Sequence, residues 1–193
     1  MTIKVDPEAV LLLIDIQQAF AAPLWGERNN PEAEANTGVL VSAWTATGRP
    51  IVRVRHASTE PGSPLRPEAP GHAYQPVVAG LTPDLEIVKS VNSAFLGTPD
   101  LGEWLTARGF RQLVITGIQT NMCCETTARF AGNLGYDVLF VIVATHTFDR
   151  TGPDGATLTA DQLTAATATN LHGEFARVVH TADLVDLATV QGM

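Results

Sequence analysis

Six short apolar runs, separated by segments of helical character, constrain the fold of this chain more than any other feature. They are rich in Val, Ile and Leu, and they lie at 10–15, 50–56, 85–90, 112–117, 137–145 and 175–180. The first, fourth and fifth are nearly all apolar, which is typical of central strands in a parallel sheet covered on both faces. The pattern therefore predicts an α/β fold with a six-stranded, mainly parallel sheet flanked by helices.

The helical segments have recognisable ends. In the first connection, Asn30 is expected to cap a helix that has Pro31 at its first position and Gly48 just beyond its end. Further helices are expected at 98–109, 121–134 and 156–171.

The connection from residue 57 to residue 83 differs from the others because it contains six prolines and three glycines. It is too broken for a helix, and a loop of this length in a compact domain is usually functional. We expect it to form a wall or lid over a site. No repeat, low-complexity tract or linker divides the chain, so the sequence predicts a single domain over 1–193.

Composition excludes several classes of function. The formal net charge is −8 and the basic residues are not clustered, which argues against a nucleic-acid partner. The apolar run at 10–14 ends at Asp15 and is too short for a signal peptide or a membrane span. We therefore expect a cytoplasmic protein with no membrane partner. The two cysteines, Cys123 and Cys124, are adjacent, so they form neither a disulfide framework nor the spacing of a zinc site.

Several reactive side chains follow predicted strands. Asp15, His56 and Lys89 end the first three strands, and the fourth leads into the cysteine pair. Ligands in open α/β sheets bind beyond these carboxyl ends, where a carboxylate, an amine and a thiol could converge for acyl transfer through a thioester. Each residue also has a structural interpretation, as a turn cap, a surface charge or a small buried side chain. Position alone does not decide between the two interpretations.

Three sequence blocks add a family resemblance. "LLLIDIQQAF", "VKSVNSAFLGT" and "ITGIQTNMCCETTARFAGNLGYDV" resemble, in order and spacing, motifs of the isochorismatase-like cysteine hydrolases, over most of residues 8–150. The resemblance implies a Rossmann-like three-layer sandwich. It also implies a catalytic triad of Asp15, Lys89 and Cys123, with Cys124 at a position that is usually Val.

The same resemblance implies further features of the site. It places a cis peptide between Ile118 and Gln119, and an oxyanion hole at the backbone N–H groups of Gln119 and Cys123. It indicates a cysteine-dependent hydrolase of a C–N bond in a small amide, lactam or carbamoyl substrate, similar to streptothricin hydrolase, N-carbamoylsarcosine amidase and nicotinamidase. Candidate pocket residues are Phe20, Trp25, His56 and Phe95.

Some residues depart from the family pattern. Nicotinamidases hold a metal through an Asp-x-His pair and a later His, but Val54 occupies the Asp position here, while His56 and His72 are present. We therefore expect no metal and no cofactor, with a metal-assisted amidase as the alternative. A non-catalytic binding module is a second alternative. His146 replaces a small residue and is expected to narrow the pocket, to reach a subunit contact or to lie at the surface. By analogy with relatives, we expect a homodimer or homotetramer.

Overall fold

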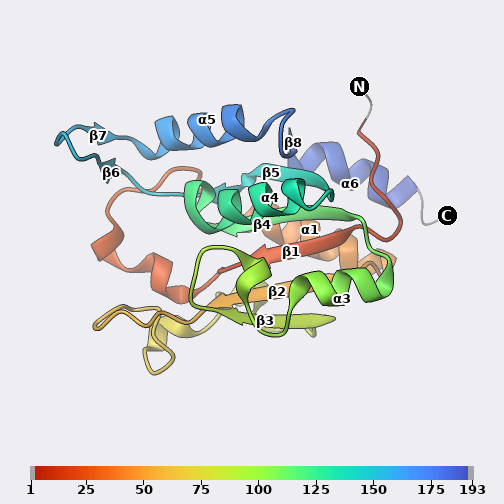
Figure 1. The fold of residues 1–193 in the computed structure, drawn as a ribbon, viewed down its shortest axis with the longest axis horizontal. Coiled ribbons are helices and arrows are strands. Elements are labelled where there is room, and N and C mark those ends of the chain that lie inside the picture. The colour runs from red at the N-terminus through yellow and green to blue at the C-terminus, as the bar shows by residue number, and fades with distance from the viewer. Residues whose placement is uncertain (1–2, 191–193) are drawn as a thin grey trace.

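A parallel sheet forms the centre of the protein, in a computed structural model that describes residues 3–190 (Figure 1). Its strands are β1 (Val10–Ile14), β2 (Ile51–His56), β3 (Leu85–Lys89), β4 (Gln112–Ile118), β5 (Asp137–His146) and β8 (Arg177–Val179). They lie in the order β3-β2-β1-β4-β5-β8, and every pairing is parallel. The predicted α/β class and six-stranded sheet are confirmed.

Both faces of the sheet are buried because side chains alternate along each strand. On β1, Val10, Leu12 and Ile14 belong to one apolar cluster, while Leu11 and Leu13 belong to the other. The first cluster packs against α3 (Leu101–Arg108), α4 (Glu125–Asn133) and α5 (Ala160–Leu171). The second packs against α1 (Ala33–Thr47) and α6 (Thr181–Val190). These two helical layers complete the predicted three-layer sandwich. Within the described residues, no helix is long and apolar enough to cross a membrane.

The predicted start of the first helix is wrong. Helix α1 begins at Ala33, and Asn30 does not cap it but adopts a left-handed backbone with φ 48°. The Asn30 amide instead donates to the carbonyl oxygens of Val143 and Thr145, at 2.9 and 2.6 Å. Asn30 therefore joins this loop to β5, a long-range role that local helix signals do not reveal. The other end follows the prediction, since Gly48 is left-handed at φ 66°.

The proline-rich connection 57–83 contains more regular structure than expected. It includes a 3₁₀ turn at Pro70–His72 and a short helix, α2 (Pro76–Ala79), which begins with proline. Gln17 fastens this connection to β2 through its buried side chain. Its amide accepts from His56 N at 2.9 Å and donates to the carbonyl oxygens of His56 and His72, at 3.1 and 3.0 Å.

Two elements lie outside the predicted pattern. Strands β6 (Arg150–Thr151) and β7 (Thr157–Leu158) form a small antiparallel hairpin after β5, separate from the main sheet. Helix α6 follows β8 and packs mainly on α1. The hairpin strands are only two residues long, which is too short for an alternating pattern to appear in the sequence.

The backbone is unusual where β1 and β4 reach the carboxyl edge of the sheet. Asp15 has φ 52°, a conformation that costs free energy in a non-glycine residue, and Gly117 has φ 135°. A Cβ atom on Gly117 would overlap the carbonyl oxygen of Ile14, so only glycine fits. This close contact brings β4 and the turn that follows it against the end of β1.

Candidate active site

Three side chains from separate strand ends meet around the ammonium group of Lys89. Its Nζ lies 2.6 Å from Asp15 Oδ2, 3.3 Å from Cys123 Sγ and 3.3 Å from His56 Nδ1. The side chains of Asp15 and Lys89 are fully buried, and Cys123 is 8% exposed. Parallel pairing of β1, β2, β3 and β4 brings these positions together, because the carboxyl ends of these strands lie at one edge of the sheet and the turn that carries Cys123 follows β4.

Burial and charge set the protonation states of this cluster. Burial alone would lower the pKa of Lys89, but the Asp15 carboxylate and Cys123 outweigh it and the pKa is raised, so the ammonium persists. Burial and then the Asp15 charge raise the pKa of Cys123, so the resting thiol is protonated. Burial, followed by the Lys89 charge, lowers the pKa of His56, which is therefore neutral near pH 7.

One oxygen of Asp15 remains available. Oδ2 accepts from Lys89, whereas Oδ1 is buried and has no hydrogen-bond partner anywhere in residues 3–190. An Asp15 oxygen, a His56 ring nitrogen and Cys123 Sγ all lie within 4.8 Å of one another. Because a buried acceptor without a partner is costly, this oxygen is well placed to take a proton from the thiol.

The free energy of unfolding should fall as the pH rises above about 8.5, where thiols of the unfolded chain ionise. The folded thiols keep their protons because the pKa values of Cys123 and Cys124 are raised, mainly by burial. Unfolding then releases protons, and each pH unit costs up to about 1.4 kcal/mol per thiol. Urea unfolding at about pH 8, 9 and 10 measures this slope. Cys123→Ala and Cys124→Ala should each make it shallower, and an unchanged slope in both variants would contradict the assignment.

The cluster opens into a cavity of about 220 Å³. This is smaller than the ~300–1,000 Å³ typical of pockets for drug-sized ligands, so it suits a small molecule. Its lining comprises Asp15, Phe20, Trp25, His56, Leu65, Asn92, Gln119, Met122, Cys123 and Arg150. Phe20 and Trp25 form an aromatic wall with ring centroids 5.2 Å apart, and Leu65 comes from the 57–83 connection. That connection therefore supplies part of the wall.

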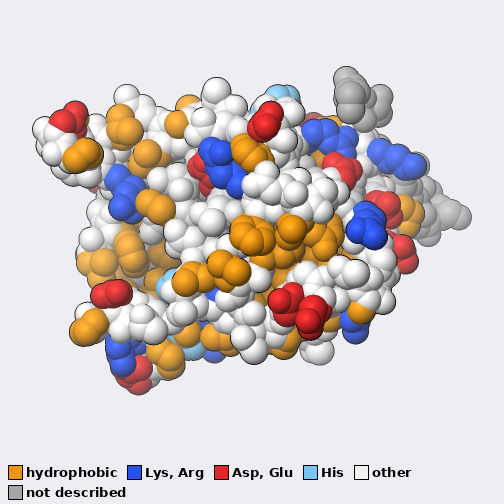
Figure 2. Space-filling model, in the orientation of Figure 1, with side chains coloured by type: hydrophobic (Ala, Val, Ile, Leu, Met, Phe, Trp, Pro, Cys, Tyr) orange, Lys and Arg blue, Asp and Glu red, His pale blue; other side chains and the backbone are white. Residues whose placement is uncertain are grey.

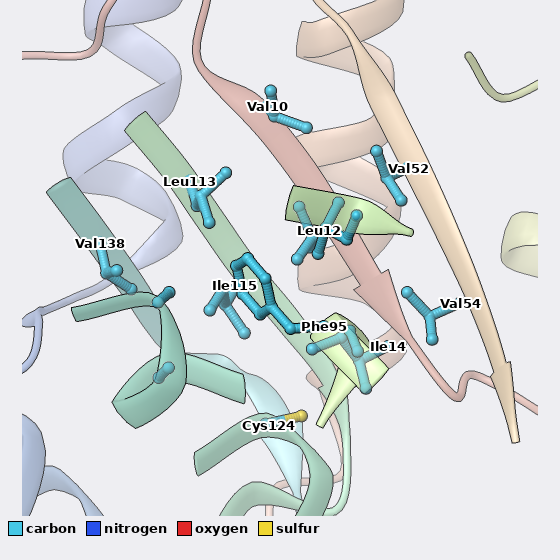
Figure 3. Packing of buried hydrophobic residues seen from close by; sticks show 14 of the residues in the cluster. Val10, Leu12, Ile14, Val52, Val54, Phe95, Leu113, Ile115, Cys124 and Val138 are labelled. Carbon is cyan, nitrogen blue, oxygen red and sulfur yellow. The ribbon is translucent and has the colours of Figure 1, made fainter. Parts of the chain in front are cut away.

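Phe95 does not line this cavity, so the prediction that it is a pocket residue is wrong. Its ring is buried together with Leu12 and Ile115 in the core cluster on the face of the sheet that α3 and α4 cover (Figure 3). It also stacks on Phe130 and lies 5.8 Å from Tyr136. On the molecular surface, hydrophobic side chains gather over the region between α3 and α4 (Figure 2). Phe95 therefore anchors its 3₁₀ turn, Ala94–Leu96, to the core.

The two adjacent cysteines lie in different surroundings. Both belong to a five-residue π-helical turn, Thr120–Cys124, between β4 and α4. Cys123 faces the cavity and Lys89, whereas Cys124 is fully buried in the apolar cluster near Ile14 and Ile115 (Figure 3). Successive helical residues point about 100° apart, which explains why only one thiol reaches the cavity.

The segment between β4 and the cysteines also lines the cavity. The peptide bond between Ile118 and Gln119 is cis, and Gln119 borders the cavity beside Cys123. Thr147 Oγ1 lies 3.5 Å from the Gln119 side-chain oxygen, close to the limit for a hydrogen bond.

His146 neither narrows this cavity nor reaches the surface. It ends β5, is 1% exposed and lies beside a separate small void that Glu34 and Thr37 also line. Its Nε2 is 3.4 Å from Glu34 Oε1, and its ring meets Phe148 edge-on. Burial lowers the pKa of His146, so this contact joins a neutral ring to a carboxylate that Arg28 already pairs at 2.8 Å. The predictions that His146 narrows the pocket or lies at the surface are therefore wrong.

Besides Leu65 of the 57–83 connection, four residues near the site were not among the sequence candidates. Asn92, Met122 and Arg150 line the cavity, and Gln17 holds the backbone of His56. Asn92 Oδ1 lies 3.7 Å from Cys123 Sγ. Gln17 lies in the first family block and Asn92 in the second. Their positions in these blocks could have identified both as candidate site residues. Arg150 lies in the hairpin that the pattern did not predict.

The donors near Cys123 do not fit a metal ion. Asp15, His56 and Cys123 offer one ligand atom each, but their shared centre is taken by the Lys89 ammonium, which contacts all three. A divalent cation would have to displace this buried charge. The nicotinamidase-type arrangement fits no better, because Val54 is a fully buried core residue that offers no ligand.

The protein is thus a parallel α/β sandwich with a thiol, an ammonium and a carboxylate at the carboxyl edge of its sheet. The chain belongs to the isochorismatase family, since the isochorismatase domain model matches residues 9–171. It is 33% identical to the isochorismatase family protein YrdC of Bacillus subtilis, over 94% of this chain and 96% of YrdC. A solved structure of this family from Chromobacterium violaceum superposes with a TM-score of 0.93, at 40% identity and 98% coverage of both chains.

Some relatives carry the names of particular activities. Nicotinamidase 3 of Arabidopsis thaliana is 33% identical, over 88% of this chain and 73% of its own length. Streptothricin hydrolase of Streptomyces noursei is 33% identical, over 75% of this chain and 57% of its own length. The family recognised from the sequence blocks is confirmed, and the protein is an isochorismatase-family hydrolase.

Proposed function

We propose that the protein hydrolyses a C–N bond in a small amide, lactam or carbamoyl compound, with Cys123 as the nucleophile. The observation that carries this proposal is the position of the Cys123 thiol at the cavity, beside an ammonium at 3.3 Å and a carboxylate with a free oxygen. The names of the two relatives support a small C–N substrate.

The first half of the reaction forms a thioester. Asp15 Oδ1 takes the thiol proton as Cys123 Sγ attacks the carbonyl carbon, and the backbone N–H groups of Gln119 and Cys123 stabilise the resulting oxyanion. The C–N bond then breaks, and Asp15 returns the proton to the departing nitrogen. Lys89 stays protonated, since its pKa is raised, and it stabilises the sulfur while its charge is negative.

The second half releases the acid. Water attacks the thioester carbonyl and gives a proton to Asp15, the C–S bond breaks, and the proton returns to the sulfur of Cys123. The free enzyme is regenerated, and an amide yields an amine or ammonia and a carboxylic acid. For a lactam substrate, both groups stay in one molecule. A carbamoyl compound yields ammonia and a carbamic acid, which then loses CO2 to leave an amine.

A screen of small amides, lactams, carbamoyl compounds and nicotinamide for release of amine or ammonia tests this proposal. The wild-type protein should hydrolyse at least one of these compounds. The Cys123→Ala protein should hydrolyse none of them. Hydrolysis by the Cys123→Ala protein would contradict a mechanism in which Cys123 is the nucleophile. Hydrolysis that a chelator abolishes would favour the metal-assisted alternative instead.

A further inference from the structure

The Arg150 guanidinium is a positive charge at the cavity that has no partner among residues 3–190. Six other arginines in the described chain pair with carboxylates, namely Arg28, Arg53, Arg55, Arg66, Arg129 and Arg177. Arg150 lines the same cavity as Cys123, yet its side chain makes no hydrogen bond or ion pair within residues 3–190.

The acidic residues nearest in sequence are engaged elsewhere. Asp149 Oδ1 accepts from Ala160 N at 2.7 Å, at the start of α5. Asp154 Oδ1 accepts from Ala156 N at 3.0 Å, inside the turn between β6 and β7. Both carboxylates therefore accept from backbone N–H groups, one in α5 and one in the hairpin turn, and neither pairs with Arg150 in the part of the chain that the structure describes.

The charges around the cavity leave a positive excess. Asp15 is the only carboxylate in the described lining, and Lys89 neutralises it at 2.6 Å. His56 is neutral because burial lowers its pKa. Arg150 is then the one uncompensated charge of this lining, in a chain whose formal net charge is −8. The cavity therefore carries positive charge although the whole chain is negative, and this favours a ligand that carries negative charge.

We propose that Arg150 binds a carboxylate on the substrate, so that the substrate is an amide, lactam or carbamoyl compound that also carries an acid group. This inference rests on the proposed function for the location of the substrate. A guanidinium presents a planar fork of N–H donors that matches two carboxylate oxygens. The wall formed by Phe20 and Trp25 supplies apolar surface for the carbon skeleton between the two groups.

Binding of benzoate and of benzamide tests the proposal without any turnover. The two probes have the same shape and differ in charge, and titration calorimetry on the Cys123→Ala protein measures both. Benzoate should bind more tightly than benzamide, and Arg150→Gln should reduce benzoate affinity about tenfold while it affects benzamide less. Arg150→Lys should recover part of the preference.

A matched control is Arg111→Gln, which removes one exposed arginine immediately before β4, at the opposite edge of the sheet. It should leave the benzoate preference intact. Absence of benzoate binding, an equal affinity for the two probes, or a preference that survives Arg150→Gln would each overturn the proposal. Because no outcome requires hydrolysis, a failed amide screen and a failed anion site are distinguishable.

Discussion

Replacement of Cys123 by alanine should reduce amide hydrolysis by at least about 10⁴-fold, because the reaction then has no nucleophile. The cavity contains no second thiol, since Cys124 is fully buried in the apolar core. Steady-state rates on any amide found in the screen measure the effect. Iodoacetamide should label the wild-type protein at Cys123, and this labelling should disappear in Cys123→Ala.

The neighbouring cysteine provides the matched control. Cys124→Ala should keep activity within the same order of magnitude and lower the free energy of unfolding by about 1–2 kcal/mol, since it leaves a small void in the core. Activity that follows Cys124 rather than Cys123 would reverse the assignment. A folded protein in which both thiols resist alkylation would also count against a cysteine nucleophile.

Replacement of Asp15 by asparagine should affect both activity and stability. The rate should fall by about 10²–10⁴-fold, because the general base is lost. The free energy of unfolding should fall by about 3–5 kcal/mol, because Lys89 is left buried without its counter-charge. Rates and urea unfolding curves of the same preparation measure the two effects.

A double variant separates these effects. Asp15→Asn with Lys89→Met removes both charges, so it should recover much of the lost stability while it remains inactive. Recovery of activity in the double variant would show that Asp15 acts only by compensating Lys89. Unchanged stability in Asp15→Asn alone would contradict the buried ion pair.

The six strands could be predicted because the strands of a sheet that is covered on both faces appear in the sequence as short apolar runs. The runs around Leu12, Val114 and Phe140 have no polar position that would interrupt them. Strand ends then place Asp15 and Lys89 at one edge, and the blocks around Cys123 select the first thiol. The sequence therefore predicts the central sheet and the reactive side chains at its edge.

The errors share a physical cause, which is that long-range contacts override local signals. Asn30 has the residue type of a helix cap, but its amide binds two carbonyl groups of β5. Phe95 follows Lys89 by six residues, and packing on Phe130 and Tyr136 directs it into the core. His146 was assigned to the pocket or the surface, and its burial beside Glu34 depends on where α1 crosses the sheet.

The separation of the β6–β7 hairpin from the main sheet has a consequence for engineering. Asp15, Lys89 and Cys123 belong to the ends of sheet strands or to the turn directly after one, whereas Arg150 belongs to a peripheral ribbon. Residues 150–158 could thus be exchanged for another ribbon without rebuilding the scaffold that carries Asp15, Lys89 and Cys123. Under the two proposals, such chimeras would keep the reaction of one parent and take the preference for a substrate carboxylate from the other.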